Sequence, residues 1–350
     1  MPRIKVSVFV AILAAWLALA LPAAAWGFPE SPAGTGPDAS LFGGVLGQIR
    51  ALPPQKGTVP GGAAGAAPPG ASASSNPVTA PHRALAGWVR QETLLPGPRL
   101  TLARPFTEAY RQSPEFTYPY GSRGDGRYVL HTGVDIVNPL GTPVRAVADG
   151  QVVYASSDAL RVFGPRPGFY GNLVITRLDG APEGGPVSVL YAHMDRILVA
   201  QGERVSAGDV LGLVGMTGIA IGPHLHLEIR QGDGSSYQAT RNPALWLKSL
   251  PGRGTLAGRI VDEAGRPVAG ERLLVYRAEN PAQVWRVVRS YVDSALIHGD
   301  DVAGENFALP DVPAGDYRIV AGGNGRTVQF PVRIEPGRLT LVEIKVENRP

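Results

Sequence analysis

Short apolar runs separated by glycine and proline turns dominate the chain from about residue 81 to residue 250. The runs are four or five residues long and rich in β-branched side chains; they span 144–147, 151–154, 173–176, 187–191, 210–214 and 225–229. No segment repeats its apolar residues every 3.6 positions, as an amphipathic helix would. The pattern predicts an antiparallel β domain over 81–250. A short turn or helix at Asn242-Pro243 would close it, with Trp246 packed inward.

A second alternating region extends from residue 253 to residue 347. Val328, Phe330, Val332 and Ile334 alternate with polar or proline positions, so one face of that strand is apolar. The length suits a sandwich of about seven strands. The predicted fold class is therefore all-β: an antiparallel β-sheet domain followed by a small β-sandwich.

The N-terminal quarter of the chain has a different amino-acid composition. In residues 56–80, 19 of 25 positions are Gly, Pro, Ala or Ser, and Lys56 is the single charged side chain. Such a segment buries too little apolar surface to offset the entropy of ordering it. The stretch 26–80 is therefore interpreted as a Pro/Gly/Ala-rich disordered linker.

Residues 1–25 have the layout of an export signal. Arg3 and Lys5 precede an apolar run over 6–21, and Ala23-Ala24-Ala25 offers a cleavage site before Trp26. The alternative is an uncleaved membrane anchor. The run has 16 residues, whereas a membrane-spanning helix needs about 20. We therefore expect a cleaved signal peptide and a secreted or cell-envelope protein, with membrane contact only if the signal stays attached.

The charge and the cysteine content of the chain exclude several classes of partner and of reactive site. The formal charge is +4, and no basic run or basic–aromatic cluster stands out, so we expect no nucleic-acid partner. The chain has no cysteine. This excludes disulfides, thiolate metal sites and a cysteine nucleophile together.

The six histidines are unevenly placed, and two of them stand in His224-Leu225-His226-Leu227-Glu228. In a strand, residues two apart share a face. His224, His226 and Glu228 would then face a cleft while the leucines enter the core. The pair suits one metal ligand and one neighbouring acid–base group, with Glu228 as a possible orienting partner. The alternative is a polar stripe on an amphipathic strand.

His131-Thr132-Gly133-Val134-Asp135 offers two further metal-binding side chains. Gly133 and the β-branched residues argue against a helix. We expect a loop entering a strand, with His131 and Asp135 converging at the bend. Catalytic zinc sites usually have three protein ligands and keep a fourth position for water, and two histidines with one aspartate would satisfy that. Alone, the spacing is weak evidence.

His193 lies in a predicted strand whose alternation places Val189, Tyr191 and His193 on one face. A lone histidine there is more often a packed structural residue. The two other histidine-bearing motifs in the same domain favour a role in the site. His82 and His298 lie outside these motifs, and both are interpreted as surface residues.

These motifs resemble the lysostaphin/LytM-type peptidoglycan metalloendopeptidases from about residue 118 to residue 246. The matching segments, in order, are Tyr120-Gly121-Ser122-Arg123, His131-Thr132-Gly133-Val134-Asp135-Ile136, Gly141-Thr142-Pro143-Val144, Ala148-Asp149-Gly150, Tyr170-Gly171-Asn172, Tyr191-Ala192-His193, Val205-Ser206-Ala207-Gly208-Asp209, Gly215-Met216-Thr217-Gly218 and Gly222-Pro223-His224-Leu225-His226-Leu227-Glu228. Relatives commonly carry an arginine where this chain has Val129, which puts substrate contacts at the entrance in doubt.

The resemblance implies a role for each site residue. His131, Asp135 and His226 would bind Zn²⁺, His224 would be the general base, and His193 would stabilise the developing oxyanion. The implied function is a zinc metalloendopeptidase that hydrolyses peptide stems or cross-bridges of bacterial peptidoglycan. The alternative is a non-catalytic wall-binding or hydrolase-activating protein with a degenerate peptidase domain. Degenerate members lose ligand positions, and this chain keeps all five.

The C-terminal region has its own resemblance. Gly258-Arg259-Ile260-Val261-Asp262, Gly265-Arg266-Pro267-Val268, and Pro313-Ala314-Gly315-Asp316-Tyr317 are similar to the carboxypeptidase regulatory-like β-sandwich. That class carries no catalytic residues. A spacer, a stability module and a module that binds wall or protein all remain open.

Overall fold

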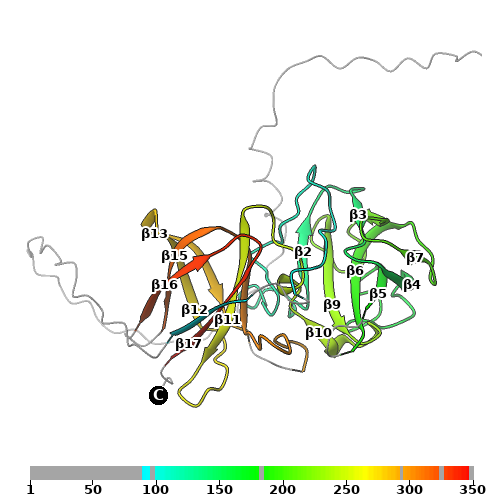
Figure 1. The fold of residues 1–350 in the computed structure, drawn as a ribbon. Coiled ribbons are helices and arrows are strands. Elements are labelled where there is room, and N and C mark those ends of the chain that lie inside the picture. The colour runs from blue at the N-terminus through cyan, green and yellow to red at the C-terminus, as the bar shows by residue number, and fades with distance from the viewer. Residues whose placement is uncertain (1–88, 95–98, 181–184, 292–294, 323–326, 347–350) are drawn as a thin grey trace, which may run out of the picture. The chain divides into compact units, whose positions relative to one another are not determined.

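Each apolar run of the middle region contributes to a strand in the computed structural model (Figure 1), although the strand that includes the start of the run 144–147 ends at Arg145. The structure describes residues 89–94, 99–180, 185–291, 295–322 and 327–346. The signal segment, the linker and His82 lie outside the described residues and stay predictions. Among the residues described, no helix has the length and apolar character needed to span a membrane.

The first sheet carries the histidine motifs and contains nine strands. They are β2 (Val134–Val137), β3 (Pro143–Arg145), β4 (Gly150–Ser157), β5 (Asn172–Leu178), β6 (Val187–Ile197), β7 (Arg204–Val205), β8 (Val210–Val214), β9 (His224–Gln231) and β10 (Thr240–Arg241). The central order is β10-β9-β6-β5-β4-β7, with β2 paired to β9, and β8 paired to β6 and β3. All these pairs are antiparallel.

Apolar side chains cover both faces of this sheet. One face packs into a large core that contains Val189, Tyr191 and Leu225. The opposite face packs into a smaller cluster that contains Phe163 and Leu190. Because both faces are covered, polar side chains on the second face can be buried as deeply as a core residue.

Two 3₁₀ helices follow β9, and they end the first region. They are η2 (Tyr237–Ala239) and η3 (Pro243–Leu245). The Asn242 side chain caps η3 by accepting from the Ala244 backbone N–H, and Trp246 is buried in the large core. The predicted closing turn at Asn242-Pro243 and its inward tryptophan are confirmed.

The C-terminal region forms two four-stranded sheets. Their strands are β1 (Val89–Leu94), β11 (Arg253–Val261), β12 (Arg272–Arg277), β13 (Asn280–Arg289), β14 (Phe307–Pro313), β15 (Gly315–Ala321), β16 (Val328–Ile334) and β17 (Leu339–Lys345). The sheet orders are β1-β17-β11-β14 and β13-β12-β15-β16. One apolar cluster takes residues from both, such as Ile260 and Ile319, so the two sheets form a sandwich. The all-β fold class is confirmed.

One feature of the sandwich differs from the prediction, and a second was not predicted. The segment 89–94, placed by sequence in the first domain, pairs as β1 with β17 of the sandwich. β11 and β17 pair in parallel, although the other strand pairs of the two sheets are antiparallel. Local alternation could not reveal either pairing, because it says which face a side chain takes and not which strand lies beside it.

Candidate metal centre

Strand β9 carries one side of the site. Its register places Leu225, Leu227 and Ile229 in the large core. The intervening residues His224, His226, Glu228 and Arg230 therefore face the opposite way, and each is at most 9% exposed. The predicted division of this strand into a core face and a polar face is confirmed.

The segment before β2 supplies the other side. Asp135 on β2 pairs directly with His226 on β9, and His131 lies in the loop that enters β2. Gly133 lets this loop pass close over β9, because a Cβ there would lie 2.4 Å from the Leu227 carbonyl oxygen. Both side chains converge at the bend, as the sequence predicted.

His193 reaches the site by a different path from the one predicted. Alternation placed it beside Val189 and Tyr191, yet both of these lie in the large core. The β5–β6 register shifts between Asn172↔Met194 and Val174↔Tyr191, and His193 has a φ of 62°. This bulge turns the His193 ring to the other face, with its centroid 4.9 Å from that of His224. The shared face of Tyr191 and His193 is thus a wrong prediction.

Three potential ligand atoms meet at one point. His131 Nε2 lies 3.1 Å from Asp135 Oδ1 and 3.2 Å from His226 Nδ1, and the last two atoms are 2.9 Å apart. Zinc bonds of roughly 2.0–2.1 Å in a tetrahedron would separate the ligand atoms by about 3.3 Å. No other described group of His, Asp or Glu residues meets the geometry of a metal site.

The hydrogen bonds of the rings fix which nitrogens carry protons. His131 Nδ1 contacts the Tyr118 carbonyl oxygen at 2.7 Å, and His226 Nε2 contacts Glu228 Oε1 at 3.0 Å. Both partners only accept, so both of these nitrogens donate. The opposite nitrogens, His131 Nε2 and His226 Nδ1, therefore point toward Asp135 Oδ1. When both rings are neutral, three acceptors face one another, which is an arrangement that a cation stabilises.

The other two histidines are oriented in the same manner. His193 Nδ1 donates to the Thr217 carbonyl oxygen over 2.8 Å, and His224 Nδ1 donates to the Gly222 carbonyl oxygen over 3.0 Å. Their Nε2 atoms are left as acceptors. His224 Nε2 lies 3.7 Å from Asp135 Oδ1, beside the three-atom group.

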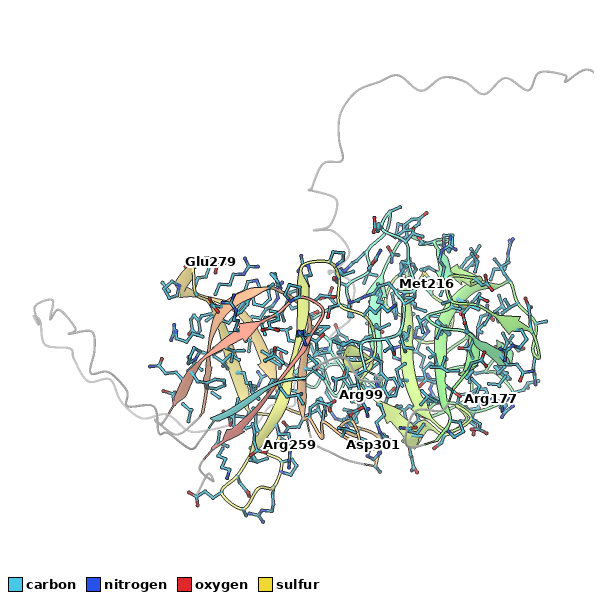
Figure 2. The ribbon with its side chains drawn as sticks, in the orientation of Figure 1. Arg99, Arg177, Met216, Arg259, Glu279 and Asp301 are labelled. Atoms are coloured by element: carbon cyan, nitrogen blue, oxygen red, sulfur yellow. The ribbon has the colours of Figure 1, made fainter. Side chains whose placement is uncertain are left out.

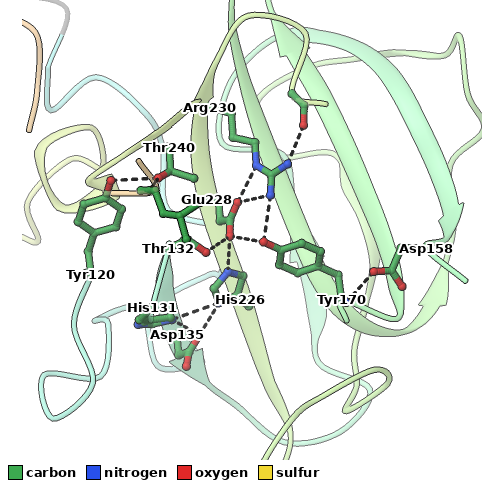
Figure 3. A network of polar contacts seen from close by, with 12 residues as sticks. Tyr120, His131, Thr132, Asp135, Asp158, Tyr170, His226, Glu228, Arg230 and Thr240 are labelled. Atoms are coloured by element: carbon green, nitrogen blue, oxygen red, sulfur yellow. Dashed lines mark hydrogen bonds and ion pairs between the residues drawn. The ribbon is translucent and has the colours of Figure 1, made fainter. Parts of the chain in front are cut away.

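A buried network stands behind His226 (Figure 3). Glu228 Oε1 accepts from the hydroxyls of Thr132 over 2.5 Å and Tyr170 over 2.6 Å as well as from His226. Glu228 Oε2 accepts from Arg230 Nε over 2.7 Å, and the guanidinium also contacts the Tyr170 hydroxyl. Both carboxylate oxygens of Glu228 thus accept from donors.

Burial and neighbouring charges set the protonation of this group. Burial raises the pKa of Glu228, but Arg230 and His226 outweigh it and bring the pKa to about 2. Burial lowers the pKa of His226, but Asp135 and Glu228 raise it to about 9. The two carboxylates therefore favour positive charge at this position, whether a proton or a metal ion supplies it.

The two remaining site histidines are held neutral. Burial lowers the pKa of His193 to about 3, and the imidazoles of His226 and His224 add to the effect. Burial also lowers the pKa of His224, although Asp135 opposes it. A neutral imidazole can accept a proton, which is what a general base requires.

Val129, which stands where relatives commonly carry an arginine, lies at the entrance of the site. Val129 is 52% exposed, and its carbonyl oxygen accepts from the Tyr118 hydroxyl. Met216 and Ile221, on the loop before β9, are also exposed (Figure 2 labels Met216). The valine therefore changes the rim of the site and leaves the ligand atoms untouched.

Several residues that shape the site were given no role from sequence. The Tyr118 ring stacks on His131 with centroids 4.2 Å apart, and Thr132, Tyr170 and Arg230 close the network around Glu228. The position of Arg230 could have been predicted from the sequence, because extending the alternation of β9 by one step places it on the same face as Glu228. His298, predicted at the surface, is only half-buried, and its backbone contacts the Tyr120 hydroxyl.

The sequence model of peptidase family M23 matches residues 129–239. Among curated proteins, the DD-carboxypeptidase/endopeptidase Mpg of Neisseria meningitidis is 45% identical over 101 residues, which is 29% of this chain and 20% of that protein. The glycyl-glycine endopeptidase ALE-1 of Staphylococcus capitis is 33% identical over 132 residues, 38% of this chain and 32% of that protein.

Among solved structures, the catalytic domain of the M23 protein EnpA from Enterococcus faecalis is 29% identical. The match covers 41% of this chain and 95% of that one, with a TM-score of 0.32. The chain spans between a fifth and a third of the length of the two curated relatives named above. The matched segment contains His131, Asp135, His193, His224 and His226. The match to peptidase family M23 therefore covers the segment that carries all five candidate site residues.

Proposed function

We propose that this chain is a zinc metalloendopeptidase that hydrolyses peptide bonds of bacterial peptidoglycan. The observation that carries the proposal is the meeting of three potential ligand atoms, from His131, Asp135 and His226, within 3.2 Å of one another. Two imidazoles and a carboxylate are ligands that zinc accepts.

The surrounding residues would divide the reaction between them. Bound Zn²⁺ would polarise the scissile carbonyl and acidify the attacking water. His224 Nε2, bare and beside Asp135, would take the proton from that water and return it to the leaving amine. His193 would stabilise the developing oxyanion after its Nε2, bare in the neutral ring, had taken up a proton from water. General acid–base catalysis of this kind contributes about 10²–10⁴-fold.

The substrate proposal is supported by the relatives. One carries the name DD-carboxypeptidase/endopeptidase and another glycyl-glycine endopeptidase. These bonds differ, but both names denote cleavage of peptide linkages. We propose peptidoglycan peptide stems or cross-bridges as the substrate class, and a non-catalytic wall-binding role as the disfavoured alternative.

The proposal also covers the location of the protein in the cell and the kind of domain that the C-terminal sandwich is. Export through the signal at 1–25 would bring the enzyme to the cell envelope, where peptidoglycan lies. The sandwich is proposed to be of the carboxypeptidase regulatory-like kind, on the sequence similarity of 258–270 and 313–317. It would carry no catalytic residue.

Metal content and wall lysis test the proposal together. The purified protein should bind about one zinc per chain, and His226→Ala should lose both metal and lytic activity. His224→Ala should keep the metal and lose turnover. Lysis that persists after chelation would refute the zinc mechanism, and loss of zinc in His224→Ala would reverse the roles of His224 and His226.

A further inference from the structure

A groove of about 1000 Å³ lies outside the metal centre. Most of its lining comes from the loop segment 111–127 and from strand β13 of the sandwich, and the rest includes Arg253, Arg272 and residues 308–311. All of these belong to the same compact unit, Val78–Pro350. β13 is an edge strand, with β12 as its only strand partner among the described residues.

The groove is strongly basic. Seven arginines and three acids line it, with no lysine among the described lining residues. Each acid already has a cation: Glu115 pairs with Arg111 over 3.1 Å, Asp125 with Arg289 over 3.5 Å, and Asp311 with Arg104 over 2.5 Å.

Five of the seven lining arginines have no carboxylate within ion-pair distance in the described part of the chain: Arg123, Arg127, Arg253, Arg272 and Arg286. Burial lowers the pKa of Arg286, and the nearby Arg277 lowers it further, although Glu115 opposes both effects. Cations crowded in this way gain from an anion between them.

Arg286 is also held in a fixed orientation. Its guanidinium carbon lies 4.1 Å from the Phe116 ring centroid and 4.8 Å from that of Trp285. Nη1 donates to the Trp285 carbonyl oxygen over 3.0 Å, so the edge formed by Nε and Nη2 is the one that can meet a planar acceptor. A carboxylate matches that fork with two parallel hydrogen bonds.

The groove is continuous with the metal centre through the backbone. Gly121 and Ser122 line the groove, and both are hydrogen-bonded to the ligand residue: Gly121 N–H donates to the His131 carbonyl oxygen, and His131 N–H donates to that of Ser122. A chain lying in the groove would therefore be adjacent to the segment that presents His131.

We propose that this groove binds the carboxylate-bearing peptides of peptidoglycan and so holds the polymer beside the metal centre. The proposal rests on the proposed function for the identity of the polymer. Charge complementarity and continuity with His131 support this occupant. Val284 and Val287 on β13, 37% and 44% exposed, add apolar contacts for the methyl groups of alanine-containing peptides.

Cosedimentation of the metal-free full-length protein with purified peptidoglycan tests the proposal without turnover. The double variant Arg286→Gln, Arg289→Gln should bind about tenfold more weakly, because it loses two charge-assisted contacts. Its binding should also depend less on salt. The control Arg333→Gln, Arg338→Gln removes an exposed and a half-buried arginine near the opposite edge strand β16 and should change affinity less than about twofold. Equal binding by the wild type and the Arg286/Arg289 variant would overturn the proposal.

Two further binding measurements identify the chemical class of the ligand. Polyglutamate should compete with the wall for the wild-type protein, and glycan strands stripped of their peptides should bind weakly and equally to all variants. If polyphosphate competes and polyglutamate does not, or if stripped glycan shows the same loss, the groove does not bind peptide carboxylates.

Two additional variants control for misfolding of the double variant and separate the effect of charge from that of guanidinium geometry. Arg289 is 54% exposed, so Arg289→Gln alone should fold and should show part of the loss even if the double variant is unstable. Arg286→Lys keeps the charge but not the fork, and should bind between wild type and the double variant. A wild-type protein that binds wall through these arginines but never lyses it would refute the proposed activity. The proposal that the groove binds peptide carboxylates would still stand.

Discussion

Glu228 and Arg230 form an ion pair that water does not reach. Both side chains have 0% exposure, and Arg230 lies 2.6 Å from Glu228 Oε2. A buried pair of this kind gives little net stability, because removing two charges from water costs about as much as their attraction returns. Its evident effect is local: it keeps Glu228 ionised and oriented toward His226 Nε2, so that Nδ1 faces the metal position.

Replacing Arg230 by methionine tests that role. The uncompensated carboxylate should cost about 3–5 kcal/mol of the free energy of unfolding. The affinity for zinc should fall about 10- to 100-fold, because the partner that orients His226 is disturbed. Chelator competition measures the affinity, and urea denaturation measures the stability.

Arg104→Met is the matched control. Arg104 and Asp311 form a second buried pair, 8% and 4% exposed, that touches no ligand. This variant should be destabilised to a similar degree while its zinc affinity stays unchanged. If Arg104→Met lost zinc as Arg230→Met does, the effect would reflect general instability and not orientation of His226.

At the scale of elements, strands place the ligands and one irregularity places His193. The segment Tyr170-Gly171 supports this bulge, because the Tyr170 carbonyl oxygen accepts from the His193 N–H. Gly171 packs directly against Thr217, whose carbonyl oxygen accepts from the His193 ring. A Cβ on Gly171 would lie 2.4 Å from the Thr217 carbonyl carbon. The spacing between these two segments thus fixes the orientation of the imidazole.

Gly171→Ala should therefore impair catalysis while sparing the metal. Displacing Thr217 moves the acceptor of His193, and misplacement of a catalytic group by about 1 Å can cost roughly 100-fold in rate. Zinc content should stay at the wild-type level, because His193 is not a ligand. Turnover and metal analysis of the same sample measure both effects.

Gly168→Ala separates backbone strain from crowding. Gly168 has a φ of 67°, close to the 69° of Gly171, but a Cβ there meets nothing within 4 Å. Both variants should lose about 1–2 kcal/mol from the left-handed backbone conformation. Only Gly171→Ala should lose turnover, and an equal loss in both would show that crowding against Thr217 is not the cause.

At the scale of the whole molecule, the two β regions share contacts that bind them into one unit. Ala257 on β11 and Leu339 on β17 belong to the same core cluster as Tyr191. Tyr120 packs against Tyr291 with ring centroids 5.4 Å apart. Contacts of this kind make the unfolding of one region costly to the other, so a single cooperative transition is expected.

Calorimetry with zinc and pH as variables tests this cooperativity. Burial raises the pKa of Glu305, in the second region, to about 7. The folded state then holds a proton that the unfolded state releases near its ordinary pKa. The stabilising effect of that proton is complete below about pH 4.5 and is lost as pH rises through 7, about 3 kcal/mol in all.

Glu305→Gln should therefore raise the midpoint of unfolding at pH 8 and change it little at pH 5. Zinc, which binds in the first region, should raise the midpoint of the same transition. Two separate transitions, one responding to zinc and the other to Glu305→Gln, would show that the regions unfold independently.

The sequence by itself determined the strands, the all-β class and the face on which His224, His226 and Glu228 lie. It could do so because alternation and turn residues act over a few neighbouring positions. The convergence of His131 and Asp135 on one bend was equally local. These features needed no knowledge of which strand lies beside which.

Tertiary structure decided the rest. The bulge that turns His193 to the site depends on the register between β5 and β6, and the pairing of β1 with β17 joins residues about 250 positions apart. Tyr170 enters the network of Glu228 from a separate strand connection. Such contacts are set by packing and burial over the whole molecule, which no local pattern encodes.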